Sequence, residues 1–299
     1  MSFEATDGVE LAGLLYEPRR PVRRAAVFLH GTGGASVFDS KRTNLLAEEL
    51  VARGIAFLPF NNRGAHLVKR LRIRRGRRSR SQAGGAAHEL IRDCVKDIDG
   101  AARFLRRRGV REMFLIGHST GANKIAVYDH YKMRNPFRKY VLLAGGDDTG
   151  MSYAALGERR FHAALERSRA MIAEKRGDDI VPPRISAQMI SWRSLRDVIN
   201  PDGDYNVFPF LEVTRGLSLS RRGRFRYVRA IRKPALFVYG DRDEYCYDDV
   251  AGCVRVLADA IGPNPNSEIV VMEDATHGFS GREHELGSLI AEWLLSSRA

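Results

Sequence analysis

Short apolar runs alternate with longer amphipathic stretches along most of the chain. Residues 25–29, 55–60 and 113–116 contain no charged side chain, which is typical of strands buried on both faces of a sheet. Residues 43–53 carry apolar side chains at three- and four-residue spacing and stop at Gly54, so they predict an amphipathic helix. The alternation predicts an α/β fold, with a mainly parallel sheet flanked by helices.

The same alternation continues to the C-terminus with one long interruption. Residues 146–233 lack strand periodicity and are rich in Arg, Ser and Pro, so we expect a helical cap or lid there, with a helix near 153–176. The core would then comprise residues 1–145 and 234–299. Other expected strands are 11–16 in an opening hairpin, 140–144, 235–239 and 268–272, and other expected helices are 86–108, the segment from 121 to about 132, 250–261 and 284–295.

Composition narrows the class of protein. No apolar stretch approaches the roughly 20 residues of a membrane span, and residues 1–4 do not resemble the start of a secretory signal. The three cysteines, Cys94, Cys246 and Cys253, form no CxxC pair and predict neither a disulfide framework nor a zinc site. Cys94 lies on an apolar helix stripe, where burial is expected. We therefore expect a cytoplasmic protein.

The formal net charge of +13 is concentrated in one segment. That segment falls within an irregular loop expected between residue 61 and about residue 85, after the strand 55–60. A loop there would leave the carboxyl edge of the sheet, where it could steer anionic substrates; a solvated surface loop is the alternative. The charged segment contains no aromatic side chain on which a base could stack, which argues against nucleic-acid binding. The charges belong to Lys69, Arg70, Arg72, Arg74, Arg75, Arg77, Arg78 and Arg80.

The candidate chemistry begins at Ser119. The run Gly117-His118-Ser119-Thr120-Gly121 matches GxSxG, with an apolar run before it and an amphipathic stretch after it, as a nucleophile elbow requires. Such a strained turn leaves no room for side chains at its two glycines. A serine nucleophile needs a histidine base and a carboxylate that orients the histidine.

Both partners follow in the order acid, then base. Asp241 and Asp243 come after the strand 235–239, and His277 follows the strand 268–272. His284 opens a helix with a charged outer turn, which favours a solvated side chain. Asp241, Asp243, Asp248 and Asp249 lack the glycine and glutamate of an EF-hand, so no metal is expected.

The motifs HGTGG, FNNRG, GHSTG, YGDRDEY and DATHGF occur in the order typical of the α/β-hydrolase superfamily, which this sequence resembles over nearly its whole length apart from 146–233. GHSTG followed by LLAGGDDTG is similar to an esterase-like branch. The resemblance implies that Ser119 is the nucleophile, His277 the base and Asp243 the acid, with Asp241 as the alternative acid. It places His118 behind the elbow, and it implies an oxyanion hole made of the backbone amides of Thr120 and Thr32, with Gly33 as the alternative to Thr32.

The expected activity is hydrolysis of a small carboxylic ester, which can be anionic, through an acyl-enzyme and without a cofactor. Thioesters and lactones are related substrates, and a peptidase or amidase is an alternative. From another class, the chain could be an inactive scaffold that binds nucleic acid or an anionic surface through residues 69–80. Four aromatic residues of the insertion could line a pocket or pack within it: Trp192, Tyr205, Phe208 and Phe210.

Overall fold

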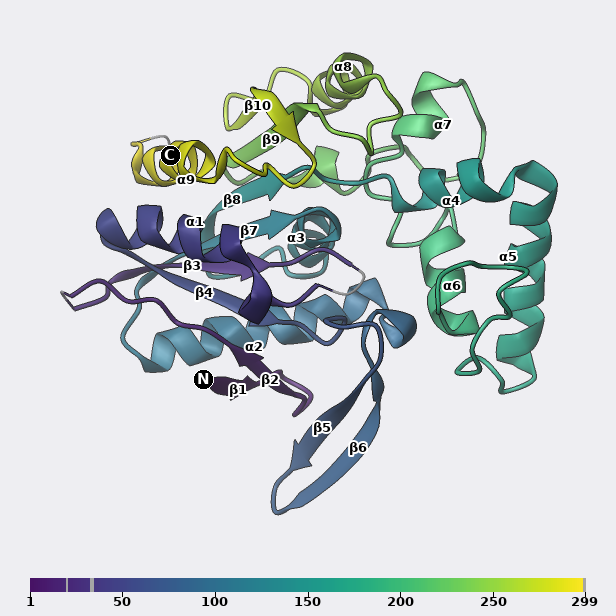
Figure 1. Ribbon diagram of the computed structural model, residues 1–299, viewed down its shortest axis with the longest axis horizontal. Helices are drawn as coiled ribbons and strands as arrows, with labels where there is room; N and C mark the ends of the chain where they lie inside the picture. The colour runs from purple at the N-terminus through teal and green to yellow at the C-terminus, as the bar shows by residue number, and fades with distance from the viewer. Residues whose placement is uncertain (20, 33–34, 298–299) are drawn as a thin grey trace.

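The computed structural model describes residues 1–19, 21–32 and 35–297. An eight-stranded sheet in the order β1-β2-β4-β3-β7-β8-β9-β10 forms its centre (Figure 1). The strands from β4 to β10 in this order are parallel, and β1 and β2 add an antiparallel edge. The mainly parallel sheet is therefore confirmed. Its strands are β1 (Ser2–Glu4), β2 (Glu10–Gly13), β3 (Arg24–Leu29), β4 (Ile55–Asn61), β7 (Glu112–His118), β8 (Phe137–Leu143), β9 (Ala235–Arg242) and β10 (Ser267–Thr276).

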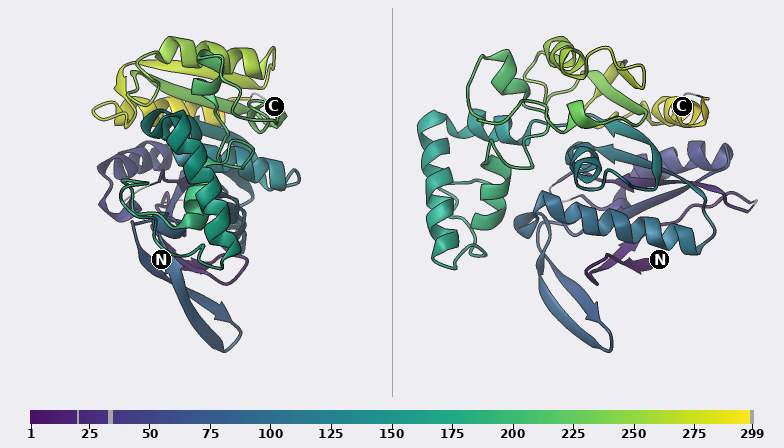
Figure 2. Two further views of the ribbon diagram at one scale, coloured as in Figure 1. Left: turned by 90° about the vertical axis from the view of Figure 1, so that its right-hand side faces the viewer. Right: turned by 180° about the vertical axis from the view of Figure 1, so that it is seen from behind.

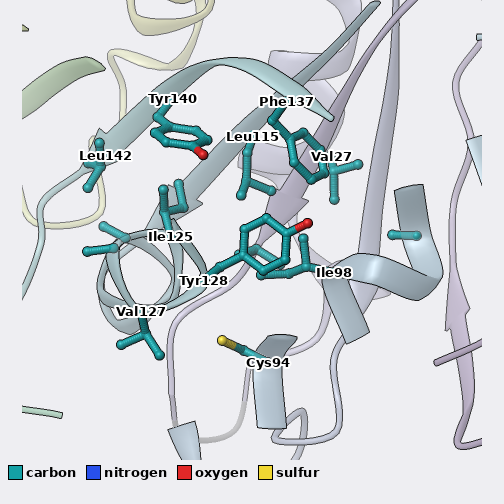
Figure 3. Packing of buried hydrophobic residues seen from close by; sticks show 14 of the residues in the cluster. Val27, Cys94, Ile98, Leu115, Ile125, Val127, Tyr128, Phe137, Tyr140 and Leu142 are labelled. Atoms are coloured by element: carbon teal, nitrogen blue, oxygen red, sulfur yellow. The ribbon is translucent and has the colours of Figure 1, made fainter. Parts of the chain in front are cut away.

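Helices cover both faces of the sheet because buried strands present apolar side chains alternately to either side. Val27 and Leu115 belong to the apolar layer that includes side chains of α2 (Cys94–Arg107), α3 (Thr120–Tyr131) and α8 (Val250–Ile261). Cys94 is buried in this layer, as expected (Figure 3). Phe28 and Ile116 face α1 (Lys41–Ala52) and α9 (Glu283–Leu295). None of the helices in the described ranges is long and apolar enough to cross a membrane.

The segment between β8 and β9 is largely helical. It contains α4 (Asp148–Leu156), α5 (Glu158–Ala173), α6 (Trp192–Ile199) and α7 (Phe210–Thr214). Helices α4 to α6 stand beyond the ends of the parallel strands (Figure 1), and α5 and α6 share a small apolar core that includes Phe161 and Trp192. The helix expected near 153–176 is present as α5 but starts later, because Gly157, at φ 72°, ends α4 and precedes α5. The division into a core and a cap stays a prediction.

The basic run is not an irregular loop. It forms an antiparallel hairpin of β5 (Lys69–Arg75) and β6 (Arg78–Gly84), which lies outside the main sheet. Leu71 and Ile73 are buried and alternate with exposed arginines, and Ile73 forms a β-bridge with Val9 of the opening segment. The hairpin therefore has one anchored side, and the rest of it faces solvent.

The helix expected at 86–108 starts later, at Cys94. Residues before it form the short 3-10 turns η2 (Ala86–His88) and η3 (Ile91–Asp93). Their backbone groups bond to the insertion instead of to a helix: Ser191 N donates to the Ala87 carbonyl over 2.7 Å, and Ile91 N donates to Asp197 over 2.8 Å. Tertiary contacts therefore replace the first turns of the expected helix.

Strand β3 pairs with β4 on one side and β7 on the other, so the crossover from β3 to β4 runs in one direction and the crossover from β4 to β7 runs back past β3 in the other. In open α/β sheets such a switch point leaves a crevice outside the carboxyl ends of the strands, where ligands bind. His30 follows β3 and Ser119 follows β7 at this point.

Candidate active site

Ser119 lies on a strained turn between β7 and α3. Its backbone has φ 57° and ψ −129°, outside the regions that most residues adopt, and its amide donates to the Leu143 carbonyl over 2.9 Å. A Cβ on Gly117 would lie 2.2 Å from the carbonyl oxygen of Gly121, and one on Gly121 would lie 2.2 Å from that of Leu29. The structure thus supplies the steric reason for both glycines of GHSTG.

His277 and Asp243 meet on the loops that follow β10 and β9. His277 Nδ1 lies 2.9 Å and 3.0 Å from the two carboxylate oxygens of Asp243, which is buried. A carboxylate only accepts hydrogen bonds, so Nδ1 carries the proton and Nε2 is left as the acceptor. Asp241 is exposed and accepts the amide of Ala275 over 3.1 Å. The structure therefore brings Asp243, and not Asp241, to the histidine.

A cavity of about 1120 Å³ lies beside Ser119 and His277. Ser119, His277, Gly31 and Thr32 lie in its wall together with apolar side chains of the insertion. Of the four aromatic residues considered as pocket candidates, Tyr205 lines the cavity, whereas Phe208 and Phe210 stack on each other at 5.8 Å and Trp192 belongs to the apolar core of the insertion. The insertion contributes Met151, Ser152, Ala155, Leu156, Ile185, Ser186, Ala187, Gln188, Met189, Ile190, Leu195, Val198 and Ile199.

The loop after β3 approaches the serine closely. A Cβ on Gly31 would lie 2.9 Å from the Ser119 Cβ, so only glycine fits there. His30 Nδ1 donates to the Gly31 carbonyl over 2.7 Å, and its Nε2 accepts the Asn62 amide over 3.2 Å. Burial lowers the pKa of His30 to about 3, so a neutral ring holds this loop. Gly33, the alternative oxyanion residue, lies outside the described residues.

A model of the alpha/beta hydrolase family matches residues 26–286. The chain belongs to this family. No sequence among the curated proteins matches it.

Solved structures similar to this alpha/beta hydrolase share its fold at low sequence identity. Est1E from Butyrivibrio proteoclasticus, with ferulic acid bound, has a TM-score of 0.64 and 14% identity over 98% of this chain and 97% of its own. A soluble variant of monoglyceride lipase from Saccharomyces cerevisiae has a TM-score of 0.62 and 14% identity over 98% and 94%. The esterase Pf2001 from Pyrococcus furiosus has a TM-score of 0.58 and 18% identity over 98% and 89%. At these identities the likeness shows a shared fold, and the three proteins are named as esterases or lipases.

His118 and Arg42 link the elbow of this hydrolase to the histidine loop. His118 Nε2 lies 2.7 Å from the His277 carbonyl, which only accepts, so Nε2 carries the proton. Nδ1 of His118 must then accept from Arg42 Nη2 at 3.2 Å, and Arg42 Nη1 donates to the Gly278 carbonyl over 2.9 Å. Burial, and then Arg42, hold the pKa of His118 well below its usual range, which keeps the ring neutral. Sequence reasoning missed this chain because Arg42 lies in α1, far away in the sequence.

Asp148 is a further residue that sequence reasoning missed. It starts α4, lines the cavity, and accepts from Asn123 Nδ2 over 3.0 Å and from the Thr120 hydroxyl over 3.3 Å. Burial, and then the neighbouring Asp147 carboxylate, raise its pKa to about 7. The run LLAGGDDTG contains it, but nothing in that run indicates that its side chain turns toward the serine.

The remaining candidates take no part in this geometry. His284 is largely exposed and its Nδ1 lies 3.1 Å from Glu49, as expected for a solvated side chain. The three cysteines are free and buried. Within the part of the chain that the structure describes, no group of three or more His, Cys, Asp and Glu side chains could hold a metal ion.

Proposed function

We propose that the protein hydrolyses carboxylic esters through an acyl-enzyme on Ser119. The observation that carries this proposal is that Ser119, on its strained turn, and His277, which is hydrogen-bonded to Asp243, line the same cavity. His277 Nε2 takes the proton of the Ser119 hydroxyl as Oγ attacks the carbonyl carbon, and later returns it to the leaving alcohol. Asp243 holds the ring in the required tautomer and stabilises its positive charge.

The backbone amides of Thr120 and Thr32 would bind the oxyanion. Thr120 is the first residue of α3, where amides have no acceptor within the helix and the helix dipole favours negative charge. Thr32 lies in the cavity wall directly after Gly31, whose lack of a side chain permits the close approach to Ser119. Such donors are worth about 3–4 kcal/mol of the activation barrier.

The ester class rests on the cavity and on the relatives. The neighbours in structure are named esterases and lipases, and the apolar side chains of α4 and α6 form one wall of the cavity. Residues 146–233 would thus serve as a cap that shapes the acyl or alcohol pocket. Thioesters and lactones need the same acyl chemistry and belong in the same panel of substrates.

Two matched pairs of variants test the proposal. Ser119→Ala should lower kcat by at least about 10³-fold and abolish labelling by a fluorophosphonate, whereas Ser152→Ala, which removes another hydroxyl of the same cavity, should do neither. Asp243→Asn should lower kcat by about 10⁴-fold, and Asp241→Asn should leave it near the wild-type value. A panel of chromogenic esters graded by acyl length and charge, with one thioester and one peptide, reads out both pairs. Full activity of Ser119→Ala would refute the mechanism.

A further inference from the structure

The basic hairpin, residues 69–84, starts and ends beside residues that line the cavity. Its base is closed by two hydrogen bonds, from Ala86 N to the His66 carbonyl over 2.8 Å and from Ala87 N to the Leu67 carbonyl over 3.0 Å. Leu67 and Ala86 also line the cavity. From this base the two strands extend away from the sheet and the helices (Figure 2). The base of the hairpin therefore adjoins the cavity wall.

The charge of the hairpin is not neutralised by its surroundings. It holds eight Lys and Arg residues and no Asp or Glu. Arg72 and Arg74 reach Glu10 and Glu4 only at 3.9 Å and 3.8 Å. Within the described ranges, no carboxylate lies within 4.0 Å of five other arginines, and all five are exposed. These are Arg70, Arg75, Arg77, Arg78 and Arg80.

Exposed apolar side chains gather around the same entrance. Five large ones, between 44% and 51% exposed, belong to segments that form the cavity wall. Three of them, Leu67, Met189 and Tyr245, line the cavity, and the other two are chain neighbours of lining residues. Apolar groups clustered at an opening mark a site of interaction more often than scattered ones do. The apolar rim consists of Phe38, Leu67, Val68, Met189 and Tyr245.

We propose that the apolar rim and the basic hairpin together dock the enzyme on an anionic lipid interface, from which a lipid ester enters the cavity. The substrate class rests on the proposed function, whereas the docking does not. Rim side chains would enter the boundary between headgroups and acyl chains, and the free arginines would bind lipid phosphates, for which the guanidinium is suited. From the sequence, the basic run could steer anionic substrates; in this proposal the same charges attract the enzyme to an anionic lipid surface.

Duplex or single-stranded nucleic acid fits the surface less well. The hairpin has no aromatic residue on which a base could stack. Three of the five rim side chains, Leu67, Val68 and Met189, are aliphatic, and a phosphate backbone offers them no apolar contact. A lipid interface supplies both the negative charge and the apolar layer.

Co-sedimentation with vesicles tests the docking. Wild type should bind vesicles of equimolar phosphatidylcholine and phosphatidylglycerol, bind pure phosphatidylcholine far less, and be released by salt. Replacing Arg75, Arg77 and Arg78 with Gln should weaken binding by roughly 10²-fold, since each arginine near an anionic surface contributes about fivefold. The matched control replaces Arg103, Arg106 and Arg107 with Gln, which removes the same charge from exposed positions on α2, and should bind like wild type.

The rim is tested by Phe38→Ser and Val68→Ser, which lie outside the cavity wall. Both should weaken vesicle binding and slow hydrolysis of an ester embedded in vesicles, while hydrolysis of a short soluble ester stays at the wild-type rate. Ser119→Ala should bind vesicles fully. If no ester is cleaved but this binding pattern holds, the proposed function fails and the docking stands. Equal binding to both vesicle types, equal loss in the α2 control, or tighter binding to duplex DNA than to anionic vesicles would overturn the docking.

Discussion

Replacing His118 with Phe separates the positioning of the histidine loop from the chemistry of the triad. Phe keeps an aromatic ring at this position but removes both ring nitrogens, so the hydrogen bonds from Arg42 and to His277, 3.2 Å and 2.7 Å long in the wild type, are both lost. Two partly buried groups, one N–H of Arg42 and the carbonyl of His277, then lose a partner. Each such group costs about 1–3 kcal/mol, which predicts a loss of about 2–6 kcal/mol in the free energy of unfolding.

The catalytic effect follows from the position of the lost bond. The His277 carbonyl is part of the same residue as the proposed base, so freeing it lets the imidazole move relative to Ser119. A misplacement of about 1 Å can cost roughly 10²-fold in rate. We expect kcat on a soluble ester to fall by about 10- to 100-fold with KM little changed, because the cavity wall that binds the substrate is intact.

Urea denaturation and steady-state kinetics on the same preparations provide the assay. His118→Gln offers an acceptor and a donor at the end of its side chain, so it should recover much of both losses. A His118→Phe enzyme with lowered stability but the kcat of the wild type would show that the chain only supports the fold. Equal losses in His118→Gln and His118→Phe would also refute the hydrogen-bond argument.

Three further substitutions test other contacts. Lys124→Met breaks a buried ion pair with Glu89 (Nζ to Oε1, 2.6 Å) and should cost about 3–5 kcal/mol in urea denaturation; adding Glu89→Leu should restore most of this. Asp148→Asn should raise the free energy of unfolding at about pH 8 by about 1–3 kcal/mol. Since the wild-type pKa rises from 3.8 to about 7 on folding, wild-type stability falls as pH increases between these values, and the variant should lose that slope. Gly121→Ala places a Cβ 2.2 Å from the Leu29 carbonyl and should cost about 1–3 kcal/mol and sharply reduce fluorophosphonate labelling of Ser119.

Each of these has a contradicting result. An unchanged urea midpoint for Lys124→Met would mean that the buried pair is solvated in solution. Parallel pH profiles for Asp148→Asn and wild type would mean that the carboxyl keeps its ordinary pKa. Full labelling of Gly121→Ala would mean that the turn has room for a methyl group.

The sequence predicts well the buried strands and the turn that holds Ser119, because both depend on local patterns. Strands 55–60 and 235–239 are continuous apolar runs, and they appear at nearly these bounds as β4 and β9. The glycines around Ser119 are required by contacts within a few residues of the turn and with the adjacent β3. Such requirements leave a signature in the residues themselves.

The β5–β6 hairpin was expected as an irregular loop because its many arginines obscure the strand pattern. Residues 70–74 alternate Arg, Leu, Arg, Ile, Arg, which is a strand pattern with one buried face, and Leu71 and Ile73 are indeed buried. β6 carries no such signal, because its residues up to Ala83 are all exposed. Its pairing is set by β5 and by the closed base, not by its own composition.

The other features that the sequence did not predict depend on contacts between segments that are far apart in the chain. Arg42 meets His118 from α1, and Asp148 meets Asn123 from the start of α4. The helix expected from residue 86 is displaced to Cys94 by bonds to the insertion. No local pattern contains these pairings, and one sequence alone does not reveal them.

The insertion enters and leaves the sheet between neighbouring strands. β8 and β9 pair directly, with Tyr140 opposite Ala235, and the Tyr140 amide bonds to the Pro234 carbonyl over 2.9 Å. The residues that shape one side of the cavity thus belong to one continuous segment between β8 and β9, whereas Ser119, Asp243 and His277 follow three different strands of the sheet. We therefore expect that exchange of the segment 146–233 would change which substrate is recognised, while the strands that carry the proposed catalytic residues keep their register.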